Sequence, residues 1–165
     1  MPDNLATIRK VIEEHQVIRK HLKLVGETVS DREAISNLEE ARIDWIPGRP
    51  QSLVEIKENL QQALSSLDEG LKNHFAFEEK NLPSLLGELF MKSIRLDHQE
   101  IIKALQQTKT MSTDTRLMGL SRDELMHKEA GTQQTISNLT QLIEDHAAKE
   151  ETLLEMLLRV LEKER

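Results

Sequence analysis

Residues 74–86 read HFAFEEKNLPSLL, and residues 146–158 read HAAKEETLLEMLL. In each stretch a histidine is followed four residues later by a glutamate, within a spacing of leucines that is typical of a helix packed into a core. Four residues make about one helical turn, so His74 and Glu78 lie one above the other on the same helical face, as do His146 and Glu150. A face that should be apolar therefore carries a histidine–glutamate pair twice in one chain.

The rest of the sequence favours an all-α protein. Leu, Glu, Lys and Gln are abundant, whereas the 165 residues include only six glycines and four prolines. Apolar residues recur at steps of three and four over four long segments, which predicts four amphipathic helices. The segments are residues 4–29, 51–81, 86 or 90 to 105, and 121–161.

Local signals mark the ends of these helices. Asn4 is the expected N-cap of the first helix, and the capping-box pattern SRDE opens the last helix at Ser121. The second helix should end or kink between Asn81 and Pro83, because proline disfavours helix at the residue before it. Thr110–Thr115 is expected to be a loop.

The first connection is longer than a simple turn. We expect one short helix there, capped by Ser30 or Asp31, followed by a break at PGRP, residues 47–50. Trp45 and Ile46 are expected to cover the end of the helices. The whole pattern predicts an antiparallel up-and-down four-helix bundle with a short extra helix in the first connection, folded as a single domain over residues 1–165.

Composition excludes several classes of function. The chain has no cysteine, which rules out disulfides, thiolate metal sites and cysteine nucleophiles. A net charge of −7, with both signs interspersed, disfavours nucleic acid as a partner. No apolar h-region opens the sequence and no apolar run approaches the ~20 residues of a membrane helix. We therefore expect a soluble cytoplasmic protein that binds neither nucleic acid nor membrane.

Four of the six histidines fall on the apolar stripe of a different predicted helix: His15, His74, His98 and His146. The other two, at positions 21 and 127, lie roughly 100–120° away around their helices. Taken singly, a core histidine is more often a satisfied polar residue than a metal ligand. The two carboxylates change this balance, because burying ionised glutamates without partners costs several kcal/mol each.

Metal cations would offset that cost. Two glutamates and four neutral imidazoles form a nitrogen–oxygen ligand set suited to Fe, Mn or Zn, and shared carboxylates favour a centre with two ions. The neighbouring acids Glu79 and Glu151 lie about 100° around the helix from these glutamates. We expect them, together with Asp97, on a solvated flank rather than among the ligands.

The chain also contains an internal repeat. HQVIRKHL surrounds His15 and HQEIIKAL surrounds His98, with His, Gln, Ile, Lys and Leu at matching offsets. The two histidine–glutamate stretches match each other in the same way. Each half therefore supplies one lone histidine and one His-x3-Glu pair, so a pseudo-two-fold axis would place three ligands on either side of a shared centre.

At these residues the sequence resembles the hemerythrin family, in its HHE cation-binding branch, over the whole stretch from His15 to Glu150. The resemblance implies an up-and-down four-helix bundle that holds two non-haem iron ions. It implies that His15 and His74 bind one ion and that His98 and His146 bind the other. It also implies that Glu78 and Glu150 bridge the two ions.

Two departures set the sequence apart from the oxygen-carrying members of the family. Ile102 stands where those members have a second histidine, and the carboxylate after His146 comes at the fourth residue instead of the fifth. We expect Ile102 to face the second ion and to leave a coordination position open to a small ligand.

Three classes of function follow. The first is a di-iron protein that binds or senses O₂, NO or iron itself, and the second is a di-iron enzyme with oxidase, peroxidase-like or NO-reducing activity. Glu79, Glu151 and Asp97 are the candidate proton donors for such an enzyme. The third is a metal-free phosphotransfer bundle, for which His127 in HKEAG is the only off-stripe histidine with suitable neighbours.

Overall fold

The computed structural model describes residues 3–41, 50–112 and 122–164, which are almost entirely helical and contain no strand. The all-α prediction is confirmed. No helix among these residues combines the length and apolarity needed to cross a membrane. The helices are α1 (Asn4–Ala41), α2 (Pro50–Asn81), α3 (Pro83–Leu86), α4 (Glu88–Ser112) and α5 (Arg122–Lys163).

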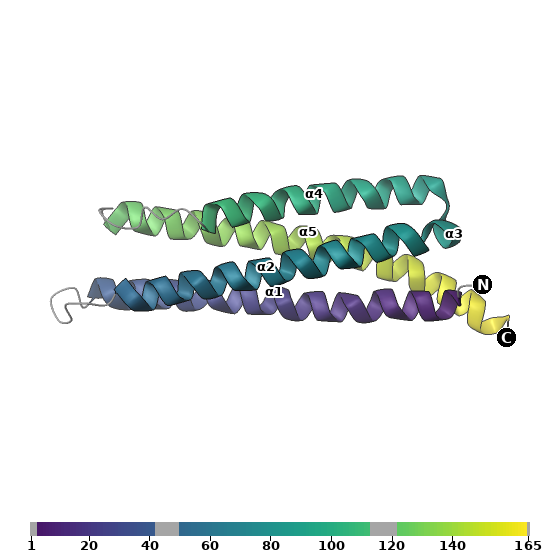
Figure 1. The fold of residues 1–165 in the computed structure, drawn as a ribbon, viewed down its shortest axis with the longest axis horizontal. Coiled ribbons are helices and arrows are strands. Elements are labelled where there is room, and N and C mark those ends of the chain that lie inside the picture. Colours follow the sequence, from purple (N-terminus) through teal and green to yellow (C-terminus); the bar gives the residue numbers. More distant parts are fainter. Residues whose placement is uncertain (1–2, 42–49, 113–121, 165) are drawn as a thin grey trace.

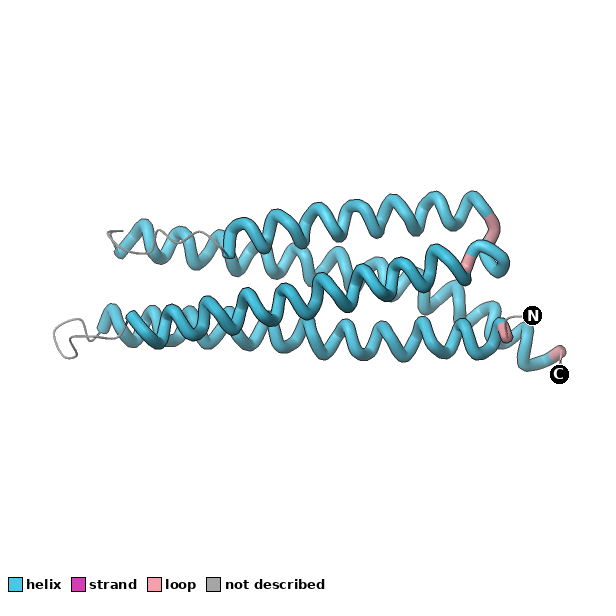
Figure 2. The backbone as a smooth tube through the Cα atoms, viewed as in Figure 1, coloured by secondary structure: helices cyan, strands magenta, loops and turns pink. Residues whose placement is uncertain are grey.

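The four long helices lie along one axis, and successive long helices run in opposite directions, so that both termini lie at the same end (Figure 1). α1 packs against α2 and α5, and α4 packs against the same two helices. The four helices therefore close a ring around a shared interior. Within the described residues, loops interrupt the helical path mainly around α3 (Figure 2). That the chain forms one domain stays a prediction.

The first helix differs from the prediction at both ends. Asp3, not Asn4, is its cap, because Asp3 Oδ1 accepts a hydrogen bond of 3.1 Å from the backbone N–H of Leu5. The helix then continues without a break to Ala41. The prediction of a separate short helix capped by Ser30 or Asp31 is therefore wrong. Neither proline nor glycine occurs in residues 30–41, so nothing in this stretch forces the helix to stop.

The extra short helix lies instead in the second connection. Pro83 occupies the first position of α3, where a missing backbone N–H costs nothing. The buried Leu82 still donates its backbone N–H to the carbonyl oxygen of Glu78 at 2.8 Å. Gly87 then separates α3 from α4 with a φ of +81°. α2 therefore ends at Asn81, within the predicted limits.

Gly87 and Gly26 form a matched pair for a stability test. The positive φ of Gly87 is a conformation that residues with a Cβ rarely adopt, so Gly87→Ala should lower the free energy of unfolding by about 1–3 kcal/mol. Gly26 lies within α1, where an added Cβ would meet no atom within 4 Å. Gly26→Ala should therefore raise the free energy of unfolding by about 0.5–1 kcal/mol. Urea unfolding measures both, and equal effects of the two changes would contradict this account of the turn.

The apolar stripe of α4, the third of the four predicted helices, begins one residue later than predicted. Phe90 is 54% exposed, whereas Met91 is fully buried, so the stripe continues from Met91 to Ile94. The helix extends to Ser112, so Thr110 is helical and not part of a loop. The other predictions for the connections lie outside the described residues: those for 42–49, which include Trp45 and Ile46, for 113–115 and for Ser121.

Two apolar clusters fill the interior of the bundle. The six predicted ligands come, along each helix, between residues of one cluster and residues of the other, so they form a polar layer between them. The larger cluster comprises Ile18, Leu22, Val25, Leu60, Ala63, Leu64, Leu67, Leu71, Phe75, Ile101, Leu105, Ile136, Leu139 and Ile143. The smaller comprises Ile8, Val11, Leu82, Met91, Ile94 and Leu154.

Candidate metal centre

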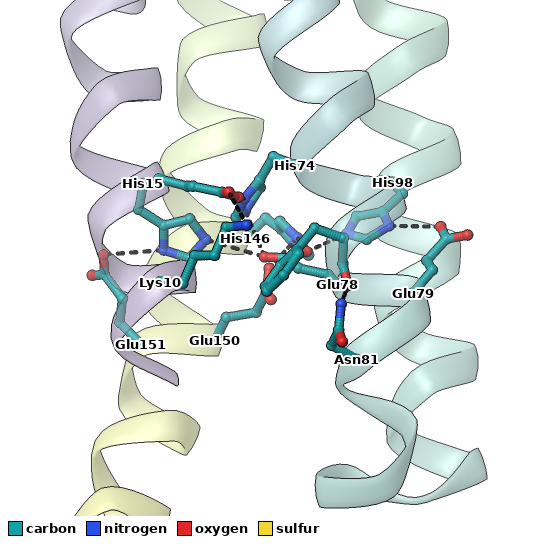
Figure 3. Close-up of polar contacts among 12 residues, drawn as sticks. Lys10, His15, His74, Glu78, Glu79, Asn81, His98, His146, Glu150 and Glu151 are labelled. Carbon is teal, nitrogen blue, oxygen red and sulfur yellow. Dashed lines mark hydrogen bonds and ion pairs between the residues drawn. The ribbon is translucent and has the colours of Figure 1, made fainter. Parts of the chain in front are cut away.

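All six predicted ligands are buried side by side in this layer (Figure 3). They form two groups whose potential ligand atoms lie within 4.8 Å of one another. One group contains His15, His74 and Glu78, and the other contains Glu78, His98, His146 and Glu150. Leaving out the shared Glu78, we call His15 and His74 the first half-site. We call His98, His146 and Glu150 the second half-site. Glu78 belongs to both groups.

Glu78 faces the two half-sites with different oxygens. Its Oε1 lies 2.5 Å from Nε2 of His74 and 3.4 Å from Nε2 of His15. Its Oε2 lies 2.9 Å from Nε2 of His98 and 4.0 Å from Nε2 of His146. The carboxylate is fully buried and thus placed to give one oxygen to each half-site.

Glu150 occupies a different position. Its Oε1 is against Nε2 of His146, one turn earlier on α5, and it is grouped with the second half-site only. Both Glu150 oxygens, and Nε2 of His74 and of His146, are buried without a hydrogen-bond partner of good geometry. Such atoms are rare in native cores, and carboxylate oxygens and imidazole nitrogens that converge in this way fit a metal ion.

Electrostatics separate the two glutamates. Burial alone raises the pKa of Glu78, but His15, His74 and His98 outweigh burial and hold that pKa well below its usual value. For Glu150, burial and the negative charge of Glu78 outweigh the favourable contact with His146, so its pKa is raised. The interior therefore accepts one carboxylate charge readily and resists the second, a resistance that a bound cation would remove.

Two of the histidines, His74 and His146, have raised pKa values because carboxylates lie beside them. Burial alone lowers the pKa of His74, but the carboxylates of Glu78 and Glu14 outweigh it and raise the pKa above its usual value. The pKa of His146 is raised against burial by Glu150 and Asp97. Metal ligation requires neutral imidazoles, so an ion entering here would displace protons.

Each of the four histidines also contacts a second carboxylate on the outer side of its ring. These contacts all use Nδ1, and each carboxylate comes from a neighbouring helix. We call Glu14, Glu79, Asp97 and Glu151 the outer carboxylates. The distances are 3.2 Å for His15–Glu151, 2.6 Å for His74–Glu14, 2.9 Å for His98–Glu79 and 3.0 Å for His146–Asp97.

The outer carboxylates explain how four rings can point the same way. A carboxylate that accepts the Nδ1 proton fixes both the ring orientation and the tautomer, which leaves the Nε2 lone pair directed into the bundle. The contacts pass from α1 to α5, α5 to α4, α4 to α2 and α2 to α1, so they close a ring around the four helices.

The sequence prediction missed this ring. Glu79, Glu151 and Asp97 were expected on a solvated flank, and they are indeed partly exposed, but each bonds a histidine of the neighbouring helix. A signal was present: an acid, Glu14 or Asp97, precedes each lone histidine, and a second acid, Glu79 or Glu151, follows each glutamate of the candidate ligand set.

The remaining candidates lie apart from the centre. His21 is half-buried and His127 is exposed, and neither joins a possible metal-binding group among the described residues. Ile102, expected to face the second ion, is half-buried and lines a surface cavity with Glu79 and His98. Phe75 covers the second half-site, with its ring stacked on His98 at a centroid distance of 3.8 Å.

Comparison with known proteins agrees with this geometry. Residues 6–158 match the family described as hemerythrin HHE cation binding domain. No curated protein and no solved structure matches the chain. The match covers nearly the whole sequence and includes all six candidate ligands. The chain therefore belongs to the hemerythrin HHE cation-binding family.

Proposed function

We propose that the protein holds two non-haem iron ions and uses them to bind or sense O₂, NO or iron itself. The observation that carries this proposal is the position of Glu78, which directs one oxygen to each pair of histidines in a fully buried site. A carboxylate in that position is suited to bridge two cations. Mn or Zn are possible substitutes for iron, because the same nitrogen–oxygen ligand set suits them.

In this proposal His15 and His74 hold the first ion, and His98 and His146 hold the second. Glu78 is shared between the ions, and Glu150 completes the second half-site. The ions would supply redox chemistry and a Lewis-acidic position for a small ligand. The chain's own contribution is to orient four Nε2 atoms through the outer carboxylates and to exclude water with the two apolar clusters.

A cavity beside the second half-site supports a small ligand. It has a volume of about 260 Å³, is lined by residues of α4 and α5, and includes His146 and Glu150 in its wall. Half of its other lining residues are apolar, namely Phe90, Ile94, Leu153 and Met156, and the rest are polar or charged, among them Asp97 and Lys149. An uncharged diatomic molecule could reach Glu150 along the apolar part of this wall.

Catalysis at the same centre is the second candidate. The outer carboxylates lie at the edge of the site and are partly exposed, so Asp97 and Glu79 are placed to exchange protons with solvent. Phosphotransfer without a metal rests only on the exposed His127, and no feature of the site favours it. A cytoplasmic location and the absence of a nucleic-acid partner stay predictions.

Gas binding to the iron-loaded protein tests the proposal. Protein loaded with Fe²⁺ without oxygen should change its visible absorption when NO or O₂ is added, whereas the Zn²⁺-loaded protein should not change. Consumption of peroxide or NO in large excess over protein would favour the enzyme. If neither gas changes the visible absorption of the iron-loaded protein, iron itself would be the only remaining candidate for the sensed ligand.

A further inference from the structure

Arg19 distinguishes the two half-sites. Its guanidinium group donates two hydrogen bonds to the carboxylate of Glu151, 2.7 Å from Nη1 to Oε1 and 3.1 Å from Nη2 to Oε2. Its Nε donates a third, of 3.2 Å, to Glu144. Glu151 in turn contacts Nδ1 of His15 at 3.2 Å. A continuous chain of contacts thus connects Arg19 to a ligand of the first half-site.

The internal repeat puts an isoleucine at the corresponding place in the other half. When HQVIRKHL is aligned with HQEIIKAL, His15 matches His98 and Arg19 matches Ile102. Ile102 lines a cavity with Glu79, the outer carboxylate of His98. The Glu79 side chain is 41% exposed, against 20% for Glu151. Among the described residues no lysine or arginine forms an ion pair with Glu79.

The other two outer carboxylates do not create this difference. Lys10 lies 3.9 Å from Glu14, and Lys149 lies 3.5 Å from Asp97, so one lysine accompanies an outer carboxylate in each half. The halves therefore differ most at Arg19 and Ile102. They also differ in ligand number, because Glu150 belongs to the second half-site alone.

We propose that Arg19 is a positioning residue that tightens metal binding at the first half-site selectively, by fixing Glu151 against His15. This inference rests on the proposed two-ion centre. The effect would offset the lack of a second carboxylate in the first half-site. Outer partners of metal-binding histidines typically change metal affinity by about 10–100-fold. The planar fork of arginine suits the two oxygens of Glu151, whereas lysine could provide only a point charge.

Single-site backgrounds give the test. His146→Ala disables the second half-site and His74→Ala the first, and Co²⁺ binding to each is followed by visible absorption in competition with a chelator. Arg19→Ile should weaken Co²⁺ binding by about 10–100-fold in the His146→Ala background. It should leave affinity in the His74→Ala background unchanged. Arg19→Lys should restore part of the loss, which a purely structural role for the arginine would not require.

Two further variants complete the design. Arg9→Ile removes an exposed arginine that lies 3.7 Å from Glu162, and it should leave both affinities unchanged. Ile102→Arg should give Glu79 an arginine partner, as Arg19 gives Glu151, and so tighten Co²⁺ binding in the His74→Ala background. This variant tests the idea even if Arg19→Ile fails to fold. Equal weakening of both half-sites by Arg19→Ile, or no gain from Ile102→Arg in a folded protein, would overturn the inference. A parent protein that binds no Co²⁺ would instead contradict the two-ion centre.

Discussion

Replacing Glu78 by alanine is expected to remove both metal ions from the protein. The two oxygens of Glu78 serve different pairs of histidines, so both half-sites lose a ligand in one change. We expect metal content to fall from two ions per chain to near zero, with a loss of affinity greater than about 100-fold for each ion. Elemental analysis after iron loading and removal of free iron measures this directly.

The matched control is Glu69→Ala, which removes an exposed glutamate from the same helix and should leave two ions bound. Circular dichroism checks that both variants remain helical. Retention of even one tightly bound ion by a folded Glu78→Ala protein would contradict the shared role of this carboxylate.

Glu150→Ala separates two roles for the other glutamate. The family resemblance predicts that Glu150 also bridges, in which case both ions would be lost. In the structure it is grouped with the second half-site only. We therefore expect about one ion per chain to remain. The loss of both ions would instead support a bridging role for Glu150.

Removing the metal from the parent protein is expected to lower its stability strongly. Each ion that binds only the folded state adds about 4 kcal/mol when its free concentration is 1,000 times its dissociation constant. Two ions would raise the melting temperature by more than about 10 °C in a chain of this length. Without metal, the two carboxylate oxygens of Glu150 and the Nε2 atoms of His74 and His146 are buried without good hydrogen-bond partners, which destabilises the fold.

Calorimetry with and without a chelator measures this difference. Iron should not stabilise the Glu78→Ala protein, which controls for non-specific binding to the acidic surface. Equal melting temperatures for the chelated and iron-loaded parent would indicate a polar core that folds without metal.

The sequence predicts much of the candidate centre because the candidate ligands follow the geometry of single helices. His-x3-Glu places two side chains on one face in any α-helix, and a lone histidine on an apolar stripe must enter the core. His15, His74 and Glu78 are therefore found where the spacing puts them. The duplication added a second, independent reason to group the two halves.

The outer carboxylates could not be predicted in the same way. Glu79 and Glu151 leave the core face of their own helices, and their partners lie on neighbouring helices. That contact depends on the relative rotation of two packed helices, which the periodicity of one helix does not contain. The same limit applies to Arg19, whose role is visible only once Glu151 is placed beside His15.

The errors in the predicted fold have local causes. Ser30 and Asp31 favour a helix cap, but a cap contributes only about 1 kcal/mol, and α1 continues through both residues. Phe90 was predicted as one of two possible starts of the apolar stripe because it lies four residues before Ile94. The one-turn helix α3 and Gly87 set the rotation with which α4 begins, and this places Met91 inside and Phe90 outside.

Anomalous X-ray scattering from crystals of the iron-loaded protein, measured at the iron absorption edge, tests the central claim most directly. The account predicts two iron peaks inside the bundle, one against His15 and His74 and one against His98 and His146, with Glu78 in contact with both. A single peak, or peaks confined to the protein surface, would contradict it.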